Sequence, residues 1–150
     1  MANVLTRVED RGSATGSIYS FLFPIPVVCF AGALVTDIVY ASSAFLMWLH
    51  FSQWLIAAGI AFGVIAGIVL LIELMVSRAI RGARLGWTHV ALFYVGLIVE
   101  VFNAFVHTAD GWTAVVPTGL ILSIIATVLM LAAGATLRRL RVPSLEYRRL

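Results

Sequence analysis

Charge is scarce in this sequence, and one basic residue type is missing altogether. Only 11% of the 150 residues are charged, whereas 62% are hydrophobic, and the mean hydropathy is +1.06. A soluble domain of this length could not bury so much apolar surface, so the composition indicates an integral membrane protein. Lysine is absent, and all ten basic residues are arginines that lie outside the apolar runs. The net charge of +3 therefore does not indicate a nucleic-acid groove, because arginines so placed are typical of cytoplasmic loops.

Cysteine and catalytic motifs are also scarce. Cys29 is the single cysteine and lies in an apolar run, so neither a disulfide framework nor a thiolate metal site is expected. The first twenty residues contain Glu9 and Asp10 but no apolar core, which predicts that no signal peptide is cleaved there. The chain has no nucleophile elbow, phosphate-binding glycine loop, zinc-ligand spacing or CxxCH haem attachment. We therefore do not expect a self-contained enzyme.

What the sequence does contain is four apolar runs. At 1.5 Å per residue each is long enough to cross a hydrocarbon core of about 30 Å. The sequence predicts an all-α, integral membrane four-helix bundle over residues 21–137, between a polar tail (1–20) and a basic tail (138–150). The expected spans are about 21–48, 53–76, 87–106 and 113–137. Pro24 and Pro26 are predicted to mark the start of the first helix, and residues 50–52 to link the first two.

The arginines predict the orientation of the bundle. All ten lie in the two tails and the middle loop, and none lies in the other two loops, HFSQ and HTADG. Both termini are therefore expected in the cytoplasm, and the protein is expected to be a multi-pass protein of the bacterial inner membrane. Six of these arginines are candidates for contact with lipid headgroups. They are Arg78, Arg81, Arg84, Arg138, Arg139 and Arg141.

The second span carries a repeat of small residues. Gly59, Gly63 and Gly67 follow the small-xxx-small spacing that lets two membrane helices approach closely. This spacing predicts helix packing, with a neighbour from this chain or from another.

The third span carries nearly all its polar side chains on one line. His89, Glu100, Asn103 and His107 recur at heptad spacing, with Phe93 and Gly96 at the intermediate places; we call these six positions the α-helical seam. The other faces of this helix are hydrocarbon apart from Tyr94. In a membrane the seam must face protein or water.

Carboxylates of two spans are expected at similar depth in the outer half of the bundle. Asp37 and Glu100 lie about fifteen and twelve residues into their spans, a difference of about 5 Å. With neighbouring side chains they form a predicted outer cluster: Asp37, Tyr40, Glu100, Asn103, His107 and His50. Three interpretations stay open, namely a hydrogen-bond network that fixes helix register, a pocket for a quinone head-group, proton or small ligand, and a metal or haem site.

Two further polar sets are predicted. Glu73 and His89 lie near the cytoplasmic boundary and are a candidate inner ion pair, or two interfacial residues in contact with water and headgroups. In the fourth span, Ser123 and Thr127 are each expected to bond to their own helix backbone.

Several stretches resemble a family of bacterial four-helix inner-membrane proteins catalogued as a domain of unknown function, family 2231. The matching pieces are FPIPVVCFAGALVTDIVY, the glycine-rich second span and DGWTAVVPTGLILSIIATVLML. Some members occur fused to, or encoded beside, c-type cytochromes and quinoprotein dehydrogenases, which implies a link to respiratory electron flow. Many members have a His-Pro before FPI, whereas this chain has TGSIYSFL; His89 matches a second family histidine. If the two histidines share a haem in relatives, this chain lacks half of the pair.

The function expected from these features is non-catalytic. The chain is predicted to be a small accessory or anchoring subunit of a bacterial respiratory or photosynthetic electron-transfer complex, in contact with membrane lipids and other membrane subunits but not nucleic acid. One alternative is a redox protein that binds quinone or haem b in the outer half of the bundle. Another is a conduit for protons or a small solute.

Overall fold

The computed structural model describes residues 18–76, 84–109 and 115–141, and the regular structure in these ranges is entirely helical. In chain order the elements are α2 (Ile18–Leu22), α3 (Pro24–Ser43), α4 (Leu46–Val76), α6 (Arg84–Thr108), the π-helical turn η1 (Val115–Gly119) and α7 (Leu120–Arg141). They form four segments of 26, 31, 23 and 25 residues that are long and apolar enough to cross a membrane. The predicted all-α four-helix membrane bundle is confirmed.

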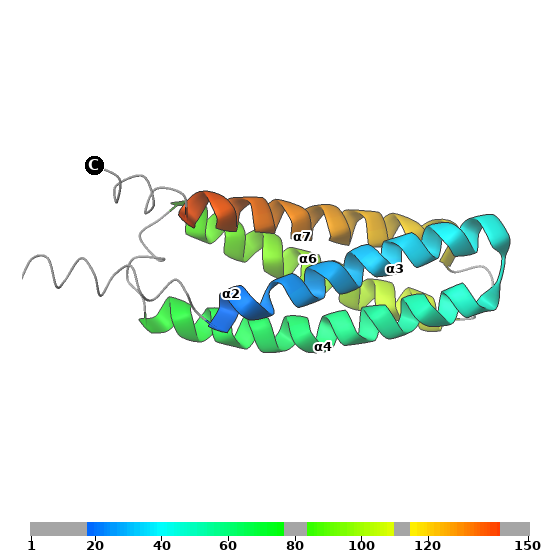
Figure 1. Ribbon diagram of the computed structural model, residues 1–150, viewed down its shortest axis with the longest axis horizontal. Coiled ribbons are helices and arrows are strands. Elements are labelled where there is room, and N and C mark those ends of the chain that lie inside the picture. The colour runs from blue at the N-terminus through cyan, green and yellow to red at the C-terminus, as the bar shows by residue number, and fades with distance from the viewer. Residues whose placement is uncertain (1–17, 77–83, 110–114, 142–150) are drawn as a thin grey trace, which may run out of the picture.

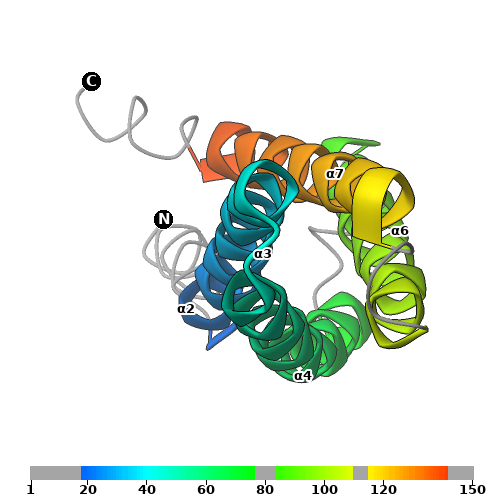
Figure 2. The ribbon, with the colours of Figure 1, turned by 90° about the vertical axis from the view of Figure 1, so that its right-hand side faces the viewer.

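The four long helices run side by side and surround one axis (Figures 1 and 2). Helix α3 packs against α4 and α7, and α6 packs against the same two helices, so α3 and α6 lie diagonally opposite each other (Figure 2). Because successive spans are antiparallel, α2 and the last turn of α7 lie at one end of the bundle (Figure 1). The outer cluster predicted from the sequence lies toward the other end.

The first span begins earlier than the prolines suggest. A turn of helix, α2, precedes Pro24, and the Phe23 N–H donates to the Tyr19 carbonyl at 2.8 Å. Pro24 and Pro26 lie in the first turn of α3, as the sequence predicts for a helix start, but α2 extends the span in front of them to Ile18. Proline is tolerated in the first turn of a helix because its fixed φ is helical and its missing N–H would have no acceptor within that helix.

The chain reverses between the first two spans at Ala44, and residues 50–52 lie within α4 instead of forming the link. Ala44 has φ 55° and ψ 17°, and its N–H donates to the Tyr40 carbonyl at 2.8 Å, which ends α3 in a left-handed cap. The hydroxyls of Ser42 and Ser43 both donate to the Val39 carbonyl, at 2.9 and 2.7 Å. These serines satisfy the helix end without glycine or proline, so the usual turn signals are missing from the sequence.

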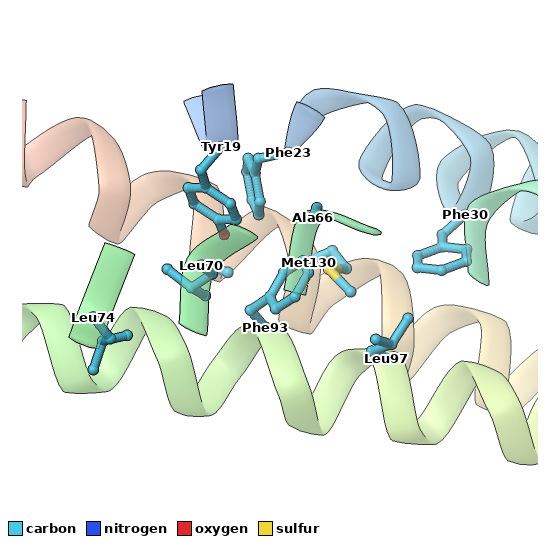
Figure 3. Packing of buried hydrophobic residues seen from close by; sticks show 10 residues of the cluster. Tyr19, Phe23, Phe30, Ala66, Leu70, Leu74, Phe93, Leu97 and Met130 are labelled. Carbon is cyan, nitrogen blue, oxygen red and sulfur yellow. The ribbon is translucent and has the colours of Figure 1, made fainter. Parts of the chain in front are cut away.

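Each helix buries one face and exposes hydrocarbon on the others. Val28, Trp54 and Phe105 are 69%, 77% and 67% exposed, which suits contact with lipid rather than water. The buried faces meet in a main apolar core, in which Tyr19 and Phe23 of the first span point toward Phe93 (Figure 3). Its members are Tyr19, Phe23, Phe30, Ala66, Leu70, Leu74, Phe93, Leu97, Met130 and Ala133.

The glycines of α4 lie at contacts with helices of this same chain. A Cβ on Gly59 would stand 2.3 Å from Cε1 of Phe30 in α3, and one on Gly63 would stand 2.7 Å from Cδ1 of Leu97 in α6. At Gly67 the nearest atoms, of Tyr94, lie at 3.4 Å, an ordinary contact distance. Close packing of α4 therefore depends on Gly59 and Gly63 more than on Gly67.

This difference gives a matched test. Gly59→Ala forces the fully buried Phe30 ring to move and is expected to cost about 1–3 kcal/mol relative to Gly67→Ala. Both substitutions gain the same helix propensity, so the comparison isolates packing. The measurement is the thermal unfolding midpoint in detergent, and equal midpoints for the two variants would contradict the packing described here.

Candidate functional site

All six positions of the α-helical seam of α6 are buried. The C-terminal part of the seam, from Glu100 to His107, contacts polar side chains of the three other long helices. Glu100, Asn103 and His107 of α6 lie beside Asp37 of α3, Ser52 of α4 and Ser123 of α7. We call these six residues the polar network. None is more than 1% exposed.

His107 is fixed by hydrogen bonds at both ring nitrogens. Its Nδ1 lies 3.0 Å from the carbonyl oxygen of Asn103, which can only accept, so Nδ1 carries a hydrogen. Its Nε2 lies 3.0 Å from Oδ1 of Asp37 and 3.3 Å from Oγ of Ser52. A hydrogen must also lie between Nε2 and Oδ1, because two facing lone pairs would repel at this distance. The pair of Asp37 and His107 therefore shares one proton and is neutral as a unit.

Ser123 connects this pair to the rest of the network. Its hydroxyl donates to Oδ2 of Asp37 at 2.5 Å and accepts from Nδ2 of Asn103 at 2.8 Å. Nδ2 of Asn103 also lies 3.4 Å from Oε2 of Glu100, one helical turn away. A continuous series of hydrogen bonds thus runs from His107 through Asp37, Ser123 and Asn103 to Glu100.

Two atoms of the polar network have no hydrogen-bond partner. They are Oε1 of Glu100 and Oδ1 of Asn103, and they are the only such buried side-chain atoms in residues 18–76, 84–109 and 115–141. Leaving a buried acceptor unpaired costs about 1–3 kcal/mol, so this pair is the least stable part of the network. Both residues are fully buried.

Four of the six residues of the predicted outer cluster come together: Asp37, Glu100, Asn103 and His107. The other two do not join them. Tyr40 is buried but packs in a separate apolar cluster with Leu49, Val115 and Trp48, and His50 is exposed.

Sequence reasoning missed two members of the polar network. Ser123 was expected to bond to its own helix backbone, as was Thr127, but Ser123 bonds to Asp37 and Asn103. Thr127 bonds to the Phe30 carbonyl at 3.3 Å, across to α3. Ser52, the other missed member, lies on the buried heptad line of α4 that continues at Ile56 and Gly59. In both helices the signal was heptad spacing of small and polar residues, which places them on the packed face.

Gly119 makes room for the imidazole of His107. A Cβ at Gly119 would stand 2.9 Å from Cε1 of His107. Val116, just before Pro117, is extended with φ −117° and ψ 119°, because the residue before a proline is displaced from the helical region. The irregular turn η1 therefore ends in a glycine at the position where the ring of His107 needs space.

The predicted ion pair of Glu73 with His89 is not formed. Nδ1 of His89 lies 2.8 Å from the Ala133 carbonyl and so carries a hydrogen, and Nε2 lies 2.6 Å from the hydroxyl of Tyr19. Both nitrogens of a neutral imidazole are thereby satisfied inside the bundle, while Glu73 is half-buried. Within the described residues the single ion pair joins His107 to Asp37.

Haem and metal ions do not fit these side chains. His89 and His107 are 2% and 1% exposed, and each ring nitrogen already has a partner, so neither offers a lone pair to iron without breaking the bundle's own bonds. His50 is exposed and does not converge with them. No group of three or more His, Cys, Asp or Glu side chains that could hold a metal occurs in the part of the chain that the structure describes.

A groove of about 370 Å³ lies at the opposite end of the bundle from the polar network. Its walls come from the first span and α7, and its lining is mostly apolar, with Arg138 at one edge. Arg138 and Arg139 are exposed there. Of the other arginines proposed to contact lipid, Arg78 and Arg81 lie outside the described residues, as do the side chains of Arg84 and Arg141.

The connecting role of Ser123 can be tested by substitution. Ser123→Ala leaves Oδ2 of Asp37 and Nδ2 of Asn103 without their main partner, so we expect a loss of about 1–3 kcal/mol of stability. Ser42→Ala is the control, because that exposed hydroxyl bonds only to its own helix and its loss should stay within about 0.5 kcal/mol. Thermal unfolding in detergent measures both, and a Ser123→Ala midpoint equal to that of the control would show that the network does not depend on this hydroxyl.

The comparisons with known proteins agree with the architecture. A family model described as "Predicted membrane protein (DUF2231)" matches residues 17–137, which include the first three spans, the fourth span up to residue 137 and the whole polar network. Comparison with curated proteins and with solved structures gave no match. The chain belongs to the DUF2231 family of predicted membrane proteins.

Proposed function

We propose that this integral membrane protein is non-catalytic and serves as a small accessory or anchoring subunit of a bacterial electron-transfer complex, respiratory or photosynthetic. The observation that supports a non-catalytic role is that the polar network is shielded from solvent. Every side chain in it that could act as acid, base or nucleophile is at most 1% exposed. Asp37, His107, Ser52 and Ser123 are bonded to other helices of the bundle, and Glu100 is bonded to Asn103 of its own helix. A substrate would have to displace those bonds to reach them.

The surface left for a partner is the outer apolar face of the bundle. Gly59 and Gly63 are occupied by contacts with α3 and α6, so they are not free to receive a helix from another subunit. Large side chains such as Trp54, Phe102 and Phe105 point outward at 77%, 62% and 67% exposure. Faces of this kind suit packing against lipid or a neighbouring membrane subunit. The electron-transfer assignment itself rests on the expectation that relatives occur beside cytochromes and quinoprotein dehydrogenases.

The orientation that accompanies this proposal places the Arg138 end of the bundle in the cytoplasm. Arg138 and Arg139 are exposed at the last turns of α7, where cations can meet the phosphates of an anionic leaflet. The polar network then lies in the half of the bundle nearer the outer surface of the inner membrane.

The subunit proposal predicts co-migration with a respiratory or photosynthetic complex. Native electrophoresis after extraction in mild detergent should place the tagged protein in a band much larger than its own 16.3 kDa, together with cytochrome or quinoprotein components identified by mass spectrometry. A tagged, unrelated four-span protein of the same membrane is the control. Migration of this protein alone, at the mass of its detergent micelle, would refute the subunit role.

A second candidate function, a proton or small-solute conduit, is favoured by the two unpaired acceptors of Glu100 and Asn103. Unsatisfied ionisable groups at depth in a membrane protein often mark the path of an ion. In this case Glu100→Gln should abolish a flux into proteoliposomes while the protein still assembles, and Glu73→Gln, at the other end of the bundle, should leave the flux unchanged. Loss of the folded protein in Glu100→Gln, or no flux in the wild type, would favour a purely structural network.

A further inference from the structure

We propose that Glu100 is a proton-binding site: its carboxyl group is a neutral acid whose O–H, on Oε1, donates to Oδ1 of Asn103. This inference concerns the state of the bundle at rest, and it holds for an accessory subunit and a conduit alike. It follows from which atoms of the polar network donate and which accept.

The acceptors and donors of the network do not balance without an additional hydrogen. Asn103 uses its amide N–H₂ toward Ser123 and Glu100, so its Oδ1 remains an acceptor without a donor. Oε2 of Glu100 accepts from Asn103, and its Oε1 is also left unpaired. A carboxylate has only acceptors, whereas a carboxylic acid has one donor. One proton on Oε1 supplies the missing donor and satisfies both atoms at once.

The charges around Glu100 lead to the same conclusion. The titratable groups that face it are Asp37 from α3 and His107 from α6, and these two form a pair that is neutral as a unit. The groups contributed by α4 and α7 are the hydroxyls of Ser52 and Ser123, which carry no charge. An ionised Glu100 would therefore be an uncompensated charge, fully buried among apolar helices, which is strongly unfavourable.

A water molecule or a metal cation fits the same two atoms less well. A water that donates to Oε1 of Glu100 and Oδ1 of Asn103 would bring two lone pairs of its own, and the Asn103 amide is already engaged. A dehydrated cation needs about six oxygen ligands, but the oxygens of Asp37 are taken by His107 and Ser123. The proton alone leaves no group unpaired.

Infrared difference spectroscopy of the purified protein in H₂O and D₂O tests the proposal. At about pH 8, exposed Asp and Glu side chains are ionised and give no carboxylic acid band. We expect the wild type to show a neutral-carboxyl C=O stretch that shifts in D₂O, and Glu100→Gln to lose it. Glu73→Gln is the matched control, because that half-buried residue lies at the other end of the bundle, and it should keep the band.

Glu100→Gln should also keep the fold, because a glutamine amide can donate to Oδ1 of Asn103 as the acid does. Asp37→Asn tests whether the band arises from Asp37 instead. A band that disappears in Asp37→Asn and persists in Glu100→Gln belongs to Asp37 and overturns the proposal. A wild type without any D₂O-sensitive carboxyl band overturns it as well, whether or not the variants fold. So does a thermal midpoint that rises with Na⁺ or K⁺ in the wild type and not in Glu100→Gln, since that result assigns the site to a cation.

Discussion

The bond between Asp37 and His107 crosses the centre of the bundle, and the arrangement of the helices depends on it. Helices α3 and α6 are diagonal partners, each packed mainly against α4 and α7, yet Nε2 of His107 reaches Oδ1 of Asp37 at 3.0 Å. At the other end of α6, His89 makes a comparable connection, to the hydroxyl of Tyr19 and the carbonyl of Ala133. The α-helical seam is thus anchored at both ends by a histidine, with Phe93 and the apolar core between them.

Such polar connections matter because the membrane removes the usual reason for helices to associate. Lipid tails are as apolar as the outer faces of these helices, so burial of leucine or isoleucine gives little preference for one neighbour over another. Gly59 and Gly63 let α4 pack closely against α3 and α6. The hydrogen bonds of His89 and His107 determine which face of α6 points inward and its position along the bundle axis. A shift of α6 along its axis would leave Asp37, Ser123 and Ala133 without their partners, which is costly where no water can replace them.

The sequence predicted this organisation as far as periodicity and membrane topology reach. Heptad spacing placed His89, Glu100, Asn103 and His107 on one face, and span depth brought Asp37 level with Glu100. The same reasoning could not assign partners, because a hydroxyl such as that of Ser123 can bond to its own helix or to a neighbour with similar energy. It also misplaced the first link, since two serines and a left-handed Ala44 end α3 where no glycine or proline marks a turn. The inner partner of His89 was missed because Tyr19 precedes residue 21, where the first span was expected to begin.

The order of groups within the polar network bears on whether it can move protons. Hydroxyl, carboxyl and imidazole groups can each accept one proton and release another. Ser123, Asp37 and His107 are three such groups joined in series by hydrogen bonds. These three groups are connected to Glu100 through the side-chain amide of Asn103. That amide carries both hydrogens on its nitrogen, and moving one of them to its oxygen is energetically costly. Asn103 therefore separates the proton shared by Asp37 and His107 from any proton on Glu100. A network built in this way retains its protons in place, which suits a bundle whose polar centre holds four helices in register more than one that conducts.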